Sequence, residues 1–191
     1  MDIGKGGVSS SLSNFSPNPF RIYIDELPKE IQNNLNFYFM PVDVLSLLER
    51  EELDIEDDSA ENKYRLYYEC SSMEGFLQGL KSDKVQIQLS IARDVGLKAK
   101  RRGAKRNKNW KSKQTLWFFG IPMKRDSKTY QDLLDVAFNS LFRNEKFKKN
   151  LLSTNGMVLT HSIGKRKIQD TVLTVSEFCS RLTKLRDYGK I

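Results

Sequence analysis

The sequence predicts an α+β fold, in which a single, mostly helical domain carries a few short strands. Apolar residues recur at helical spacing in several segments, of which 73–80 and 130–141 are the clearest. Alternation of apolar and polar residues indicates short strands at 20–24, 64–68 and 157–161. A chain of 191 residues without internal repeats is long enough to bury one core.

The first third of the chain is expected to combine a flexible start, an irregular loop and an acidic segment with the strand at 20–24. Residues 1–11 are small and polar, which is typical of a flexible N-terminus, and residues 12–191 are expected to form the domain. Prolines within 12–20 favour an irregular loop. Farther along, 44–48 suggests a short helix, and 49–61 carries eight acidic residues. We expect this acidic segment to be solvated, with a partner surface or an acidic mimic of nucleic acid as alternatives.

The remaining chain is predicted to be mainly helical, and capping signals mark several helix ends. Ser127 or Thr129 is expected to cap a helix that ends near Phe142. Thr174 and Glu177 form a capping-box pattern at the start of the last helix. Further helices are expected at 71–81, 83–95 and 147–152, with Gly96 as a stop and a turn at Asn155-Gly156.

The composition favours an anionic partner. The chain has a net charge of +8 and a pI near 9.4, and long-range attraction concentrates phosphate-bearing ligands near such a protein. Two isolated cysteines predict reduced thiols, and the lack of a long apolar run predicts a cytoplasmic protein that does not contact a membrane. His161 is the only histidine, so we expect no metal site and no cofactor.

One turn of the helix at 71–81 presents three polar groups that suit a site. Glu74, Gln78 and Lys81 share a face at helical spacing, beside an adjacent apolar stripe. In the alternative interpretation Ser71 caps the helix, Glu74 completes a capping box and Lys81 is solvated. The local pattern is compatible with both.

Residues 98–113 form the most basic stretch, with nine cations, no acid and Trp110 among them. A stripe of cations attracts a polyanion, so we expect Lys105, Arg106 and Lys108 to draw nucleic acid towards the protein. Trp110 has a ring that can stack on a base, although a lone Trp more often lies at the edge of a core. The alternative is a solvated basic loop.

Short motifs in the same order resemble the NADAR superfamily of N-glycosidases. The first is a Leu-Ser-Asn-Phe stretch that is followed by Pro and an aromatic residue. The second is a helix that carries Glu, then Gln four residues later, then Lys seven residues after the Glu. A basic segment with Trp, an aromatic-Gly pair before Arg-x-Ser-x-x-Tyr-Gln, and a Leu-x-His strand end follow in that order. The matching residues are Leu12 to Phe20, Glu74, Gln78, Lys81, Gly96, Lys100, Lys108 to Trp110, Phe119, Gly120, Arg125 to Gln131, Leu159 to Gly164 with His161, and Glu177, Phe178, Leu182 and Arg186 of a closing helix. Residues 28–63 depart from the compact family pattern and are interpreted as an insertion.

The resemblance implies a metal-independent hydrolase that removes ADP-ribose from ADP-ribosylated guanine in nucleic acid. Glu74 is then the catalytic carboxylate, which activates a water or stabilises the positive charge that develops at ribose C1′. Lys81 and Arg125 suit phosphates, and surface solvation is the alternative for each. The implied substrate-binding residues are Asn14, Gln78, Lys81, Trp110, Phe119, Arg125, Tyr130 and His161, although an isolated histidine is usually structural.

Two other functions are compatible with the sequence. The same superfamily includes N-glycosidases that hydrolyse phosphorylated intermediates of riboflavin synthesis, and the motifs do not separate these substrates. The basic stretch favours nucleic acid over an ADP-ribose-like small molecule, because a free metabolite needs only a few cations in a pocket. A non-catalytic nucleic-acid-binding module is the third candidate, although no helix-turn-helix, zinc-finger or RNP signature is present.

Overall fold

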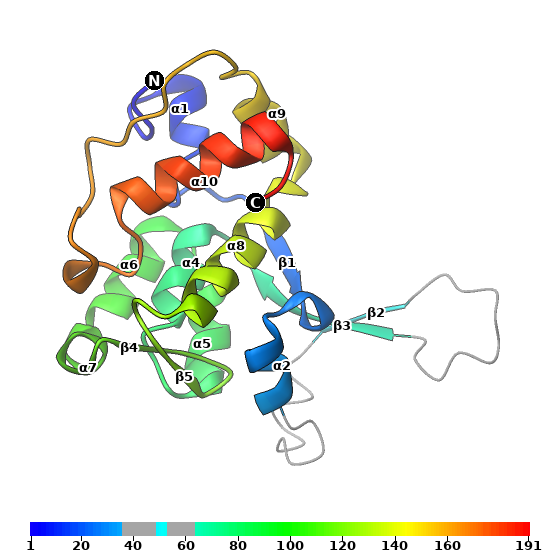
Figure 1. Cartoon of the computed structure of the whole chain (residues 1–191), viewed down its shortest axis with the longest axis vertical. Coiled ribbons are helices and arrows are strands. Elements are labelled where there is room, and N and C mark those ends of the chain that lie inside the picture. Colours follow the sequence, from blue (N-terminus) through cyan, green and yellow to red (C-terminus); the bar gives the residue numbers. More distant parts are fainter. Residues whose placement is uncertain (36–48, 53–63) are drawn as a thin grey trace.

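The computed structural model describes residues 1–35, 49–52 and 64–191, and it confirms a mostly helical α+β domain (Figure 1). A three-stranded antiparallel sheet has the order β1-β3-β2, and a separate hairpin pairs β4 with β5. The strands are β1 (Phe20–Tyr23), β2 (Glu49–Glu52), β3 (Tyr64–Cys70), β4 (Thr115–Phe118) and β5 (Ile121–Lys124). The helices are α1 (Gly7–Ser11), α2 (Lys29–Asn34), α4 (Met73–Gly79), α5 (Val85–Ala92), α6 (Gly96–Ala104), α7 (Asn107–Lys113), α8 (Lys128–Phe142), α9 (Glu145–Leu152) and α10 (Val175–Tyr188).

The core forms around α8, whose inner face is fully buried and packs against β1 and α10. Ser127 caps this helix, as the sequence predicts, by accepting a hydrogen bond from the backbone N–H of Tyr130 (3.2 Å). The Thr174–Glu177 capping box at the start of α10 is likewise confirmed. Such capping residues are reliable signals because their side chains accept hydrogen bonds from backbone N–H groups that have no partner within the first turn of the helix.

The N-terminus differs from the flexible segment that its composition predicts. Ile3 is fully buried, and its backbone N–H donates to the carbonyl of Thr160 (2.8 Å). The strand expected at 157–161 is reduced to an isolated bridge between Asp2 and Thr160, and Val158 is 78% exposed. The first residues therefore pack onto the segment after α9, which the polar composition of 1–11 did not reveal.

The basic stretch forms two helices, so the alternative of a loop is wrong, although most of its cations are exposed. It spans most of α6 and all of α7, and the α7 C-cap residue Gln114 has a left-handed backbone (φ 47°). Gly96, which was expected to stop the preceding helix, begins α6 with φ +52°, a conformation that favours glycine. The β4–β5 hairpin that follows had no clear sequence signal.

The acidic segment is described only in part. Residues 49–52 form β2, which pairs with β3 in the register Glu49 to Tyr67 and Glu52 to Tyr64. The short helix expected at 44–48 and the acidic residues of 53–61 lie outside the described residues. Within the described part of the chain, no helix is long and apolar enough to cross a membrane.

Glycines let α4 pack closely on its neighbours. A Cβ at Gly75 would lie 2.5 Å from the carbonyl oxygen of Asp94 and 2.6 Å from that of Ala92, distances that real Cβ atoms do not adopt. A Cβ at Gly79 would lie 3.0 Å from the carbonyl oxygen of Gln88. Because these neighbours are backbone atoms, α4 and α5 cannot accommodate larger residues without moving apart.

We expect Gly75→Ala to lower the free energy of unfolding by about 3 kcal/mol, since overpacking a tight contact forces the backbone to shift. Gly79→Ala should cost less, because its closest contact is longer. Urea unfolding of both variants tests this order, with Ser112→Ala on the exposed face of α7 as the control. Equal stability of Gly75→Ala and the wild type would contradict the close packing.

Candidate functional site

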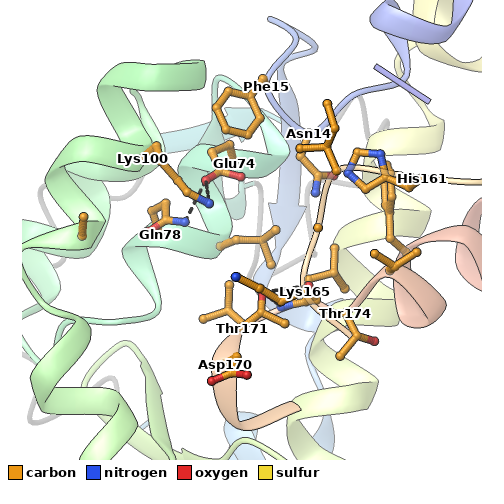
Figure 2. A pocket seen from close by; sticks show the side chains of 18 of the residues that line it. Asn14, Phe15, Glu74, Gln78, Lys100, His161, Lys165, Asp170, Thr171 and Thr174 are labelled. Carbon is orange, nitrogen blue, oxygen red and sulfur yellow. Dashed lines mark hydrogen bonds and ion pairs between the residues drawn. The ribbon is translucent and has the colours of Figure 1, made fainter. Parts of the chain in front are cut away.

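A cavity of about 830 Å³ lies beside α4. Its walls come from α4, α6 and α7, from the loop at 13–15, and from the irregular segment and helix start at 161–178. Figure 2 shows Glu74 and Lys100 on one wall, with His161 and Lys165 across from them. The cavity thus collects charged side chains from segments that are distant in sequence.

The start of α4 fixes the position of Glu74. Ser72 is the N-cap and accepts a hydrogen bond from the backbone N–H of Gly75 (3.0 Å), while its hydroxyl donates to the carbonyl of Asp94 (3.0 Å). The capping box that joins Ser71 to Glu74 is therefore wrong, because the helix begins one residue later. The backbone N–H of Glu74 donates to the carbonyl of Asn14 (2.9 Å), which ties the helix to the N-terminal loop.

The Glu74 carboxylate is buried, with a side chain that is 5% exposed. Its Oε1 accepts a hydrogen bond from Gln78 Nε2 (2.7 Å) and lies 3.5 Å from Lys100 Nζ. Both of these contacts go to Oε1, and no described residue bonds to Oε2, so we assign Oε2 to a water or a ligand. Gly103 makes this arrangement possible, because a Cβ there would lie 2.0 Å from Gln78 Oε1. The glycine in α6 therefore leaves the space in which Gln78 holds the carboxylate.

Lys81 lies just beyond the end of α4 and is 6% exposed. Its Nζ donates to Asn107 Oδ1 (2.9 Å), and Trp110 Nε1 donates to the same oxygen (3.2 Å). Burial is the largest cause of a lowered pKa at Lys81, and together with the charges of Lys100 and Lys111, against the opposing effect of Glu74, it brings the pKa from 10.5 to about 8. The interpretation of Lys81 as a solvated surface residue is therefore wrong.

The opposite wall includes His161 and the segment that follows it. His161 Nδ1 lies 2.9 Å from the carbonyl oxygen of Ile3, so this nitrogen carries the proton in the neutral ring and donates. The ring packs against Phe178 with centroids 5.3 Å apart. Lys165 and Asp170 line the same cavity. No group of three or more His, Cys, Asp or Glu residues that suits a metal ion is found in the described ranges.

Six of the nine site residues predicted from the sequence line this cavity. They are Asn14, Glu74, Gln78, Lys81, Trp110 and His161. Trp110 is 1% exposed, so its ring belongs to the wall and to the core at once. Lys105 and Lys108 are exposed outside the cavity, and Arg106 is half-buried and donates to the carbonyl of Arg102 (2.8 Å).

Phe119, Arg125 and Tyr130 do not line the cavity. Phe119 packs edge-to-face against Phe118, with ring centroids 4.7 Å apart, in the core beside Tyr68. The hydroxyl of Tyr130 donates to the carbonyl of Val172 (2.5 Å), and burial raises the pKa of Tyr130 above its usual range. These residues are corrected to core positions, because their aromatic surfaces are more stable against other apolar groups than in a polar cavity.

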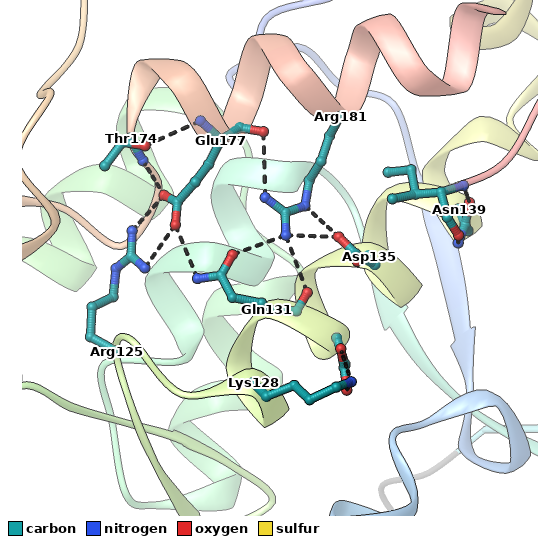
Figure 3. A network of polar contacts seen from close by, with 10 residues as sticks. Arg125, Lys128, Gln131, Asp135, Asn139, Thr174, Glu177 and Arg181 are labelled. Atoms are coloured by element: carbon teal, nitrogen blue, oxygen red, sulfur yellow. Dashed lines mark hydrogen bonds and ion pairs between the residues drawn. The ribbon is translucent and has the colours of Figure 1, made fainter. Parts of the chain in front are cut away.

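Arg125 belongs to a structural ion-pair network (Figure 3). It is 1% exposed and binds both carboxylate oxygens of Glu177, at 3.0 and 2.6 Å. Gln131 Nε2 adds a hydrogen bond to Glu177 Oε1 (3.0 Å). The network joins the end of β5 to α8 and α10, so Arg125 is neither a phosphate ligand in this cavity nor a solvated cation.

The sequence analysis missed several residues that line the cavity. Lys100, Asn107, Lys111, Lys165 and Asp170 were not assigned to a site. Lys100 and Lys111 lay within the basic stretch, but their orientation depends on how α6 and α7 pack. Lys165 and Asp170 come from an irregular segment, where no periodicity indicates which side chains face inwards.

A family model described as "Bacteriophage protein GP30.3" matches residues 66–187. The chain belongs to this family. A family relative from Enterobacteria phage T4, titled "Uncharacterized 17.1 kDa protein in Gp30-rIII intergenic region", is 36% identical over 117 residues, which cover 60% of this chain and 76% of the relative. No solved structure matches the chain.

The GP30.3 assignment overturns the resemblance to the NADAR superfamily, including the expectation of a NADAR-like domain. The GP30.3 model matches one continuous span that contains all but the first of the short motifs behind that resemblance. Any helix with one polar face places polar residues at this spacing, so the Glu, Gln and Lys positions do not by themselves identify a superfamily. The Arg-x-Ser-x-x-Tyr-Gln segment supplies Arg125 and Tyr130 to the core, so it gives no support to a shared site.

The Arg125–Glu177 pair should stabilise the fold in a pH-dependent way. Burial alone raises the pKa of Glu177, but hydrogen bonds from Arg125 and Thr174 outweigh it and lower that pKa from 4.5 to about 2. A carboxyl with a lowered pKa in the folded state contributes stability at neutral pH, and this contribution is lost as the pH falls from about 4.5 towards 2.

We expect Arg125→Met to lower the free energy of unfolding at pH 7 by about 3 kcal/mol, because the partly buried Glu177 carboxylate loses its ion-pair partner. The deficit should shrink at pH 3, where Glu177 of the variant is protonated. Denaturant unfolding at both pH values measures this. Lys128→Met is the control, since the exposed Lys128–Asp132 pair is worth less than about 0.5 kcal/mol. A deficit that does not change with pH would rule out this account.

Proposed function

We propose that this protein is a hydrolase that cleaves the N-glycosidic bond of a phosphorylated ribosyl group, and that its substrate is ADP-ribose attached to guanine in nucleic acid. The observation that carries the proposal is the buried Glu74 carboxylate in a cavity that also contains Lys81 and Lys100. The carboxylate and the lysines support the reaction type, whereas ADP-ribosylated guanine as the substrate is the expectation stated in the sequence analysis.

Glu74 has the properties that glycosidic cleavage requires. Positive charge builds at ribose C1′ as the base departs, and a carboxylate stabilises that charge or deprotonates the attacking water. The hydrogen bond from Gln78 fixes the carboxylate, and its free Oε2 is the atom we assign to the water. A fixed carboxylate that is shielded from solvent stabilises a cationic transition state more strongly than one in bulk water, and the Glu74 side chain is only 5% exposed.

The cavity also suits the phosphates of such a ligand. At about 830 Å³ it falls within the usual range for sites that bind small molecules. Lys100, Lys111 and Lys165 line it and supply positive charge from three different segments. Asn14 and His161 offer hydrogen-bonding groups on the opposite wall. We therefore place the ribose near Glu74 and the phosphates among the lysines.

The cationic surface of α6 and α7 supports a substrate attached to nucleic acid. Its exposed cations are Lys98, Arg101, Lys105, Lys108, Lys111 and Lys113. Of these, Lys111 also lines the cavity, and the others lie on or between the same two helices that form the cavity wall with Lys100, so we place a bound strand beside this wall. The size of the cavity favours the alternative of a free phosphorylated metabolite, such as a riboflavin-pathway intermediate. A purely non-catalytic binding module gives Glu74 no role.

We expect Glu74→Gln to abolish hydrolysis with little change in melting temperature, because the amide keeps the size of the side chain but loses its charge and basicity. The assay measures release of ADP-ribose from an ADP-ribosylated guanine oligonucleotide, and of the base from a ribosylamino-pyrimidine phosphate. Glu145→Gln at the exposed start of α9 is the matched control. Full turnover by Glu74→Gln would remove Glu74 from the mechanism, and an inactive wild type would favour the binding module.

The basic surface should act on substrate capture and leave the chemical step unchanged. Changing Lys105, Arg106 and Lys108 to Gln is expected to raise KM for a modified oligonucleotide and to reduce the slope of log affinity against log salt by about 2–3. The value of kcat should stay near wild type. Neutralising Lys146, Lys149 and Lys190 together provides a control with the same loss of charge. A fall in kcat at constant KM would place the basic surface in the active site instead.

A further inference from the structure

We propose that Lys81 is an amine nucleophile that forms an imine with the C1 aldehyde of a ring-opened ribosyl phosphate. This chemistry rests on the ligand class of the proposed function, but it does not require glycosidic hydrolysis. It assigns to Lys81 a covalent role in place of simple attraction to phosphate.

The position of Lys81 meets the geometric needs of a nucleophile. The side chain enters the cavity from the end of α4, and its amine is held by Asn107 Oδ1 at 2.9 Å. The Trp110 ring lies beside it, with the centroid 5.9 Å from Nζ. Among the described residues, no carboxylate lies within ion-pair distance of the amine. Because Lys81 is 6% exposed and has no paired carboxylate among these residues, the protonated form of its amine is disfavoured relative to the neutral form.

The surrounding charges favour the neutral, nucleophilic amine. Lys100 from α6 and Lys111 from α7 repel the protonated form, whereas Glu74 from α4 attracts it. Lys165 and Asp170 of the facing segment lie in the same cavity with opposite charges. Burial and the two neighbouring lysines lower the pKa of Lys81 to about 8. Desolvation and an adjacent cation are two ways in which proteins activate lysine for imine formation.

A lysine that only binds phosphate would be placed differently. Such a role benefits from a permanent charge, and the more exposed Lys100 and Lys111 supply that charge at the same cavity. At pH 7 a pKa of about 8 gives a neutral fraction on the order of 100-fold larger than that of an ordinary lysine. The cavity therefore combines cations that suit a phosphate with one amine that suits an aldehyde.

The reaction balances without an added oxidant or cofactor. The lone pair of Lys81 Nζ attacks C1 of the aldehyde, the carbonyl electrons move to its oxygen, and that oxygen takes a proton. The carbinolamine then loses its hydroxyl with a proton as water, and the C1–N double bond forms. We assign the movement of these protons to Glu74, which lines the same cavity and whose charge acts on Lys81. The products are one imine and one water.

Reductive trapping tests the proposal directly. The wild-type protein is incubated at pH 7 with ribose 5-phosphate and cyanoborohydride, which reduces the imine to a stable secondary amine. Intact mass should increase by one ribose 5-phosphate less one oxygen atom, and peptide mapping should place the adduct on Lys81. We expect modification of Lys81 to exceed that of any exposed lysine by at least about tenfold. The rate should rise with pH and level off above about 8.

Two variants and one comparison separate this proposal from the alternatives. Lys81→Arg keeps the positive charge, and Lys81→Met keeps the approximate length of the side chain. Both variants should lose the ribose 5-phosphate adduct at position 81. Peptide mapping of the wild type decides the question even if neither variant folds. An adduct spread over the exposed lysines, or located on Lys100 or Lys111, would overturn the proposal. Hydrolysis without trapping would refute the imine alone, and trapping without hydrolysis would refute the glycosidase alone.

Discussion

The close approach of α4 to α5 and α6 is the constraint on which the site depends. Gly75 and Gly103 are the contact points, and a Cβ at either position would overlap a neighbouring atom. Gly75 brings α4 against the carbonyls of Ala92 and Asp94, and Gly103 leaves room for the Gln78 side chain. Because interiors are close-packed, this contact transmits any displacement of α6 to the Glu74 carboxylate. Two glycines with no side-chain chemistry thus determine where the carboxylate lies.

Buried charge is handled in two different ways in this fold. Arg125 is matched by Glu177 with two hydrogen bonds, and Gln131 and Thr174 satisfy the carboxylate further. Among the described residues, the Lys81 amine has one hydrogen-bond partner, the Asn107 side-chain oxygen, and two neighbouring lysines repel its charge. A complete network stabilises the fold, whereas an incompletely paired charge costs stability and persists where it has another use. The contrast separates the structural cluster from the candidate site.

Local signals predicted the helices better than the site. The capping box of Thr174 and the N-cap Ser127 were correct because both depend on atoms within one turn. Helical spacing also placed Glu74, Gln78 and Lys81 on one face, and all three line the cavity. The roles of the other site residues could not be predicted, because they depend on contacts between segments that are far apart in the sequence. Arg125 was predicted to bind phosphate, with surface solvation as the alternative, because its partner Glu177 comes from α10, far away in the sequence. The irregular segment at 163–173 has no periodicity from which the orientation of Lys165 or Asp170 could be predicted.

The family match and the cavity do not cover the same residues. The GP30.3 span of 66–187 contains Glu74, Lys81 and the lysines of α6 and α7, but it excludes the N-terminal loop. That loop supplies Asn14, whose carbonyl accepts from the backbone N–H of Glu74 (2.9 Å), and Ile3 holds His161 in the same way on the opposite wall (2.9 Å). Both walls are therefore tied to the first fifteen residues. Since their hydrogen bonds join segments far apart in sequence, the ordered N-terminus is part of the structure that closes the cavity.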